Sequence, residues 1–255
     1  MSFGRRACLQ LAGVGGVALL SARSAQAFGE SAAFNPRLLL AGNRKTPAWA
    51  DSAAARWAWE LLRRTSAPAR LVPSRVSADR AELWSEPFAI WCGDSDVGSL
   101  SNAELRGMTR FFRLGGVLLV DDAAPANGSF GRSARREIAR VLPDSPPVRL
   151  DSTHVLFKAY YLLDRPVGRS LGAGHLDAIV RGKNAQVLFS DFDLLGALAR
   201  NGDTWAFEVE PGGSVQRERA ARLCVNIAMY LLCSDYKDDQ VHAEWLMRRR
   251  ANPRR

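Results

Sequence analysis

The sequence predicts an α/β fold in which a mostly parallel sheet is covered by helices. From Pro36 onward, short apolar runs alternate with longer amphipathic segments, which is the order typical of this fold class. The chain has 255 residues, of which 47% are hydrophobic, so it can bury a core of the size that a large α/β domain needs. The alternation contains no internal repeat. We expect one folded domain over residues 34–235.

The first part of the alternation predicts two strands and two helical segments. Trp57 and Leu61 lie at helical spacing, and Pro68 follows them as a stop signal. The expected elements, in order, are a strand over residues 37–41, a helix over 51–62, a strand over 69–72 and a helical turn over 79–84.

The centre of the chain predicts a unit of strand, helix and strand. Two strongly apolar runs, residues 88–92 and 117–121, indicate buried strands. Between them, Ser101 is placed to cap a helix, and Glu104 three residues later completes a capping box. A double glycine at 115–116 ends that helix. Such a crossover between parallel strands is right-handed almost without exception.

The last part of the domain predicts a hairpin, a long loop and a closing helix. Pro143 ends a preceding helix, and the turn after Arg181 has the composition of a hairpin turn. Long loops in a compact domain are usually functional or mobile. The expected elements, in order, are a helix over residues 133–142, paired strands over 176–180 and 186–190, a polar loop over 194–213, a buried helix over 216–232 and a basic C-terminal tail over 236–255.

The N-terminus predicts a twin-arginine signal peptide over residues 1–27. Arg5 and Arg6 precede a glycine-containing apolar run, and Ala25 and Ala27 form the small-x-small pattern of a signal peptidase site. An ordinary export signal or an uncleaved anchor is the alternative. The apolar run is shorter than the ~20 residues that span a bilayer. We expect a periplasmic or otherwise exported protein without a transmembrane segment in its mature chain.

The charge and the cysteines exclude several classes of protein. The net charge of +9 falls to +6 without the three arginines of residues 1–27. The basic tail could bind phosphates or an anionic membrane, or it could be a solvated end. Nucleic acid is not an expected partner, because no module of interleaved aromatic and basic residues occurs. The odd count of Cys92, Cys224 and Cys233 argues against a disulfide framework, and we expect Cys224 and Cys233 to be core residues.

Acidic residues follow three of the predicted strands. Ligands of open parallel sheets bind beyond the carboxyl ends of the strands, where clustered carboxylates favour Mg²⁺ or Ca²⁺. Asp191 and Asp193 would point the same way if the strand continued through them. Capping and turn roles are the alternative, because aspartate is favoured at both. The candidate metal ligands are Asp94, Asp121, Asp191 and Asp193, and the candidate catalytic residues are Asp121, Asp122 and His154.

Several segments together resemble a bacterial family, the domain of unknown function 4159. The segment at residues 105–122, with Phe111-Phe112, the double glycine and Val117 to Asp122, is similar to the signature of that family. Residues 34–38, 152–157 and 226–230 are similar to its opening strand, its histidine-centred segment and its closing helix. The resemblance implies a flavodoxin-like three-layer sandwich of the class I glutamine amidotransferase-like type.

The resemblance also implies that amidotransferase chemistry is absent. Enzymes of that superfamily carry a cysteine nucleophile on the turn after the strand that follows the double glycine, together with a His-x-Glu pair. Here that turn holds Asp121 and Asp122, Cys92 belongs to the preceding strand, and the sequence His242-Ala243-Glu244 lies beyond the last core helix. Family members are often fused to, or encoded near, membrane-anchored envelope proteins, which implies partners of that kind.

Three functions follow from these patterns. The first is a non-catalytic binding or scaffold domain without a cofactor, which uses the strand-end edge and the loop 194–213 as its contact surface. The second is a metal-assisted hydrolase in which a divalent cation held by the aspartates and His154 activates water. The third is a carbohydrate-binding module that uses Trp49, Trp57 or Trp205, if these side chains are not part of the core. Ligand and oligomeric state stay open.

Overall fold

The computed structural model describes residues 33–182 and 184–251, and in the last helix it describes side chains only as far as residue 233. The predicted signal peptide over residues 1–27 therefore lies outside the described residues. Within the described ranges, seven strands form one sheet in the order β2-β1-β3-β4-β7-β6-β5. They are β1 (Leu38–Leu40), β2 (Arg75–Ser77), β3 (Phe88–Gly93), β4 (Val117–Asp122), β5 (Val148–Leu150), β6 (Leu176–Arg181) and β7 (Asn184–Ser190).

The sheet is mostly parallel, as the alternation of strands and helices predicts. Strands β2, β1, β3, β4 and β7 run parallel to one another. Strand β6 runs antiparallel to both of its neighbours, and its pairing with β7 is the hairpin expected from the sequence. A separate ribbon pairs β8 (Arg200–Asn201) with β9 (Thr204–Trp205).

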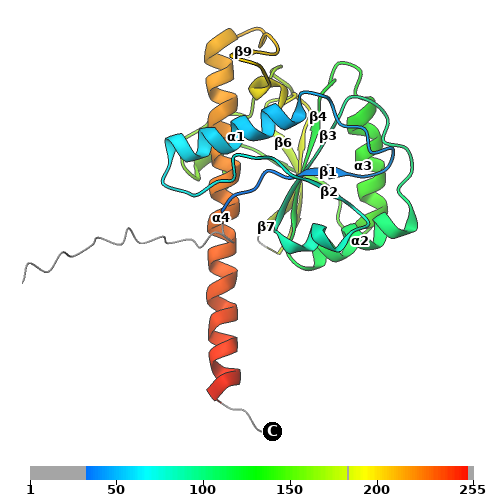
Figure 1. Cartoon of the computed structure of the whole chain (residues 1–255), viewed down its shortest axis with the longest axis vertical. Helices are drawn as coiled ribbons and strands as arrows, with labels where there is room; N and C mark the ends of the chain where they lie inside the picture. The colour runs from blue at the N-terminus through cyan, green and yellow to red at the C-terminus, as the bar shows by residue number, and fades with distance from the viewer. Residues whose placement is uncertain (1–32, 183, 252–255) are drawn as a thin grey trace, which may run out of the picture.

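Helices cover both faces of the sheet, which confirms the three-layer arrangement. Figure 1 shows α1 and α4 on one face and α2 and α3 on the other. Successive strand residues point to opposite faces, so Leu38 packs with α1 and α4 while Leu39 packs with α2 and α3. The helices are α1 (Ala50–Arg64), α2 (Asn102–Arg113), α3 (Ser129–Val141) and α4 (Gly213–Ala251), with short 3₁₀ helices η2 (Ala81–Ser85), η3 (Val155–Lys158) and η4 (Gly196–Leu198).

The capping box predicted for α2 is present. The Ser101 hydroxyl accepts a hydrogen bond from the Glu104 amide at 3.3 Å, and the Glu104 carboxylate accepts one from the Ser101 amide at 2.9 Å. Glu104 also accepts a hydrogen bond from the Gly42 amide at 3.1 Å, just beyond β1. The cap therefore satisfies the amides of Ser101 and Glu104 and ties α2 to the end of a core strand.

A buried tryptophan joins the two helices of the first face. Trp57 of α1 is completely buried, and its ring packs against Phe34 and Phe88. Its indole nitrogen donates a hydrogen bond to the backbone oxygen of Cys224 in α4 at 2.8 Å. The polar atom of the buried ring is thus satisfied, and α1 and α4 are fixed relative to each other.

Helix α4 extends beyond the α/β body. Its first part packs against α1, η3 and η4, and Figure 1 shows its later part projecting away from the sheet. The segment predicted as a basic tail over residues 236–255 has a helical backbone up to Ala251. Among the described residues, no helix is both long and apolar enough to cross a membrane.

The predicted strand over residues 69–72 is wrong. Ala69 forms an isolated bridge with Phe34, and the paired strand at this edge of the sheet is β2, which begins at Arg75. Leu71 and Val72 are exposed, and Pro73 behind them has no backbone N–H to donate to a neighbouring strand. The apolar composition of this segment therefore marks a surface connection rather than a sheet strand.

Three further expectations need correction. Helix α3 begins at Ser129 rather than residue 133, because the Asn127 side chain accepts a hydrogen bond from the Ser129 amide and starts the first turn earlier. The predicted polar loop over residues 194–213 is buried in its first part, where residues 194–199 are apolar and include η4. Cys233 is exposed near the end of the packed part of α4, whereas Cys224 is a core residue as expected, and Cys92 is buried as well.

Gly107 provides a test of how α2 packs. A Cβ atom added to this residue would lie 1.8 Å from the backbone oxygen of Ala78, which no backbone shift of a few tenths of an ångström relieves. We expect Gly107→Ala to lower the free energy of unfolding by ~1–3 kcal/mol, as overpacking in a rigid core does. Urea denaturation measures this change. The neighbouring exposed variant Arg106→Ala serves as the control, and equal stability of the two variants would contradict the packing described.

Candidate functional site

The predicted aspartates lie at one edge of the sheet. Asp121 and Asp122 end β4, Asp191 and Asp193 follow β7, and Asp94 follows β3. Because β3, β4 and β7 are adjacent and parallel, their carboxyl ends meet at the same edge. This is the edge at which open parallel sheets bind ligands.

Asp121 is a completely buried carboxylate that holds β4 to the segment after β7. Its Oδ1 atom accepts hydrogen bonds from the Ser190 hydroxyl at 2.5 Å and from the Leu194 amide at 2.9 Å. Its Oδ2 atom accepts one from the Leu195 amide at 2.9 Å. All three donors belong to the protein, so the carboxylate is satisfied internally.

Asp193 forms a sharp elbow between β7 and η4. Its φ of 53° lies in the left-handed region, which residues other than glycine rarely adopt. The buried carboxylate accepts a hydrogen bond from the Gly196 amide at 2.9 Å, which caps η4, and it forms an ion pair with Arg169. Gly168 packs on this elbow, since a Cβ atom there would lie 2.3 Å from the Phe192 oxygen. The elbow is therefore enclosed by protein on the side that carries the carboxylate.

The two buried carboxyls have unusual acidity. Burial and, to a smaller extent, the charge of Asp193 together raise the pKa of Asp121 to about 7. Burial likewise raises the pKa of Asp193 to about 6, although the Arg169 guanidinium opposes the shift. Arg169 was not found from the sequence, because 23 residues separate it from the elbow that it covers and no local pattern marks it.

Asp122 and Asp191, by contrast, contact α3 on the other face of the sheet. Asp122 accepts hydrogen bonds from the Ala124 amide at 2.9 Å and from the Gly131 amide in the first turn of α3 at 3.0 Å. Asp191 is half exposed and pairs with Arg135 of α3 at 2.5 Å. Asp94 is exposed.

The condition under which Asp191 and Asp193 would point the same way, a strand that continues through both, is not met. Strand β7 ends at Ser190, and the left-handed backbone of Asp193 turns its side chain inward toward Arg169. Within the described residues, no group of three or more His, Cys, Asp or Glu side chains is arranged to hold a metal ion. Turn and cap roles, the alternative considered for these aspartates, account for the hydrogen bonds of Asp121, Asp122 and Asp193.

The contacts of the His154 side chain are structural ones. Its Nδ1 atom accepts a hydrogen bond from the Leu156 amide at 3.3 Å at the start of η3, and its ring centroid lies 5.9 Å from that of Tyr230. Burial lowers the pKa of His154, which opposes a role as a charged group near neutral pH.

The buried thiols are not reactive groups. Cys92 on β3 and Cys224 on α4 are both completely buried. Burial raises the pKa of each thiol well above its usual range, and the nearby Asp121 carboxylate raises both further. A buried, protonated thiol is a poor nucleophile, so neither residue meets the requirement of thiol catalysis.

The tryptophans divide between core and surface. Trp57 is in the core, and Trp49 packs edge-on against Phe207 with ring centroids 5.4 Å apart. Trp205 on β9 is 37% exposed, and its ring lies close to three guanidinium groups. Sequence reasoning missed Trp59, which lies on α1 three residues after Arg56 and four before Arg63, a spacing that places all three on one helix face.

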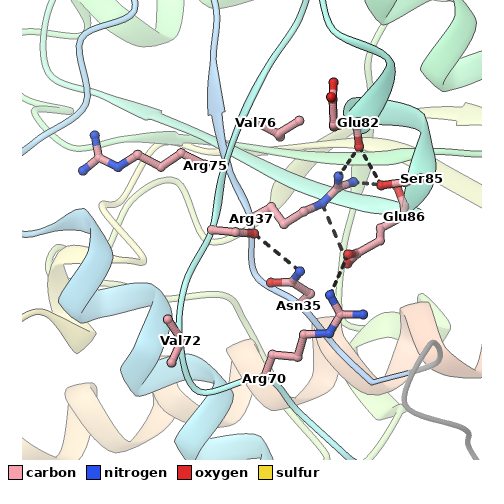
Figure 2. Close-up of a pocket in the computed structure, with 10 residues that line it drawn as sticks. Asn35, Arg37, Arg70, Val72, Arg75, Val76, Glu82, Ser85 and Glu86 are labelled. Atoms are coloured by element: carbon pink, nitrogen blue, oxygen red, sulfur yellow. Dashed lines mark hydrogen bonds and ion pairs between the residues drawn. The ribbon is translucent and has the colours of Figure 1, made fainter.

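A pocket of about 320 Å³ opens at the opposite, amino-terminal edge of the sheet. Figure 2 shows the Arg37 guanidinium directed at the loop of Glu82 to Glu86, where it donates to three backbone oxygens, including that of Glu86 at 2.6 Å, and it donates to a fourth on Phe88. The Arg75 guanidinium points away and pairs with Asp51. The arginines of this pocket therefore make contacts that stabilise the fold. They do not form a free cluster that could bind an anion.

The paired carboxyls predict a pH effect on stability. Asp121 and Asp193 keep their protons in the folded chain up to about pH 7 and 6, whereas aspartate in an unfolded chain loses its proton near pH 4. Between the pKa of the unfolded chain and those of the folded chain, the folded state therefore binds more protons than the unfolded state. This contribution to stability is lost as the pH rises through the folded pKa values. We expect urea denaturation between pH 5 and 8 to show a more negative slope for the wild type than for Asp193→Asn. Equal slopes would contradict the raised pKa values.

The hydrogen bonds of Asp121 predict a structural cost when the carboxylate is replaced. In Asp121→Asn, the amide nitrogen cannot accept a hydrogen bond, so one buried donor among Ser190, Leu194 and Leu195 loses its partner. We expect a loss of ~1–3 kcal/mol in the free energy of unfolding at pH 7, measured by urea denaturation.

Asp94→Asn, an exposed aspartate at the same edge, is the matched control and should change stability by less than ~0.5 kcal/mol. Removal of a catalytic group often stabilises a fold, because active sites are strained. A stabilised Asp121→Asn variant would therefore argue for a catalytic role.

No curated protein matches the chain. The profile of a family described as a domain of unknown function, DUF4159, matches residues 42–232. The match includes the strands β3, β4 and β7, whose ends carry the aspartates, and it covers more than half of the chain. The resemblance seen in the sequence is thereby confirmed, and the chain belongs to the DUF4159 family.

Proposed function

We propose that this protein is an exported, non-catalytic binding or scaffold domain of the cell envelope. The observation that carries the proposal is the internal satisfaction of the acidic edge, where Asp121 and Asp193 are completely buried and bonded to donors of the same chain. A general acid or base must come within hydrogen-bond reach of a substrate. The carboxylates of Asp121 and Asp193 instead accept hydrogen bonds that hold β4, β7 and η4 together.

The thiols support the same conclusion. A nucleophilic cysteine needs exposure and an activating base. Cys92 and Cys224 lie inside the sandwich, and the nearby carboxylate of Asp121 disfavours their thiolate forms. The His154 ring likewise makes structural contacts, since it lies beside Tyr230 and accepts a hydrogen bond at the start of η3.

The proposal includes a class I glutamine amidotransferase-like ancestry of the fold. The support is the three-layer arrangement around a mostly parallel sheet. In that superfamily the nucleophile stands on the turn after the strand that follows the double glycine, which here is β4. That position holds Asp121 and Asp122, and the left-handed elbow of Asp193 follows β7 instead.

The proposal also includes export by the twin-arginine route and a periplasmic location. Its support is the order of Arg5-Arg6, an apolar run and the Ala25-Gln26-Ala27 site at the start of the chain. Envelope or membrane-anchored proteins are the proposed partners.

Cross-linking in intact cells tests this function. The wild-type chain is expected to cross-link to a defined envelope protein, and Asp191→Asn and His154→Ala are expected to retain that partner, because neither side chain is proposed to do chemistry. Arg5→Lys with Arg6→Lys is expected to leave the protein in the cytoplasm and to abolish the cross-link.

An exported protein of similar size is the control for non-specific capture. The proposal fails if the wild type yields no product beyond that control. It also fails if the purified protein binds Mg²⁺ or Ca²⁺ by calorimetry and hydrolyses a substrate in a manner that Asp191→Asn or His154→Ala abolishes.

A further inference from the structure

Arginine and tryptophan side chains gather on one surface of the α1 face. This arginine–tryptophan surface consists of Arg56, Trp59 and Arg63 of α1 together with Arg200 and Trp205 of the β8–β9 ribbon. The Arg56 guanidinium lies 3.9 Å from the Trp59 ring centroid and 5.0 Å from that of Trp205, so it links the helix to the ribbon. Figure 1 shows α1 and β9 on the same side of the sheet as α4.

The surface is held rigidly from beneath. The Ser52 hydroxyl of α1 donates to the Arg200 backbone oxygen at 3.0 Å and accepts from the Arg200 amide at 3.0 Å. Arg217 of α4 is buried under the ribbon, with its guanidinium 4.3 Å from the Trp205 centroid and hydrogen-bonded to the Ala197 oxygen at 2.6 Å. The ribbon therefore presents Trp205 in a defined position, which lowers the entropy cost of binding.

The surface carries uncompensated positive charge. Arg56 pairs with the buried carboxylate of Glu60, which Arg64 shares, and Arg64 also pairs with Glu218. In the part of the chain that the structure describes, neither Arg63 nor Arg200 has a carboxylate within ion-pair distance. Arg63 and Trp205 are exposed to solvent. The surface thus combines fixed aromatic rings with two arginines, Arg63 and Arg200, that have no carboxylate partner among the described residues.

These features distinguish between ligand classes. A sugar needs a free aromatic face, but guanidinium groups lie within 5.0 Å of the centroids of both rings. A protein partner fits better, because tryptophan and arginine dominate the energetics of protein interfaces and the guanidinium fork binds carboxylates in a bidentate manner. We infer that the arginine–tryptophan surface binds an acidic segment of a partner protein. This inference rests on the proposed binding function and names the surface and the chemistry of its partner.

Fluorescence anisotropy with the full-length chain tests the inference. The probe is a labelled peptide rich in glutamate, compared with the same peptide carrying glutamine at each of those positions. The glutamate peptide is expected to bind, and Arg63→Glu with Arg200→Glu is expected to weaken it about tenfold or more, as is Trp205→Ala. Added salt should weaken binding as well.

A matched charge reversal on the other face is the control. Arg106→Glu with Arg113→Glu changes the net charge equally on exposed positions of α2, and it is expected to change the affinity by less than about twofold. Equal weakening by both double variants, or no binding of the glutamate peptide, would overturn the inference. Binding to phosphatidylglycerol vesicles in place of the peptide would also overturn it and identify a membrane surface as the occupant.

The two proposals can fail separately. If intact cells yield an envelope partner that cross-links equally to the wild type and to Arg63→Glu with Arg200→Glu, the binding function stands and this surface is wrong. If no partner cross-links at all, the proposed function itself fails.

Discussion

The buried carboxylate of Asp121 organises the centre of this molecule. It accepts a hydrogen bond from Ser190 across the β4–β7 pair and two from the amides of Leu194 and Leu195 beyond it. Those contacts set the point at which β7 ends and the chain turns into the η4 segment. This turn depends on the left-handed backbone of Asp193, whose carboxylate forms an ion pair with Arg169. The carboxylate of Asp121 therefore links the β4–β7 strand pair to the elbow at Asp193.

A consequence of this arrangement concerns where function can lie. In most open parallel sheets the carboxyl edge is the hollow that receives a ligand. Here the space beneath the elbow is filled by apolar residues of η4 and by α4, and the polar groups of that edge bind one another. The surface that offers unpaired charge and fixed aromatic rings lies instead on α1 and the β8–β9 ribbon, both of which this core supports from below.

The sequence predicted the elements that depend on local patterns. The capping box of Ser101 and Glu104, the crossover from β3 to β4 and the β6–β7 hairpin are as expected, because each is specified by residues close together in the chain. The strand placed over residues 69–72 failed because exposed Leu71 and Val72 resemble buried apolar residues in composition alone. The aspartates were found as a group, yet the direction of Asp193 was not, since it depends on one backbone angle.

The amino-acid order by itself determined the α/β class, the family and the positions of acidic residues after the strands, since periodicity and local spacing carry that information. Only the tertiary structure decided what those residues do. Whether an aspartate meets solvent, a backbone amide or an arginine depends on segments distant in the chain, as the pairing of Asp193 with Arg169 shows. The meeting of Arg56 with Trp205 is of the same kind, because hydrogen bonds between α1 and a distant ribbon bring them together.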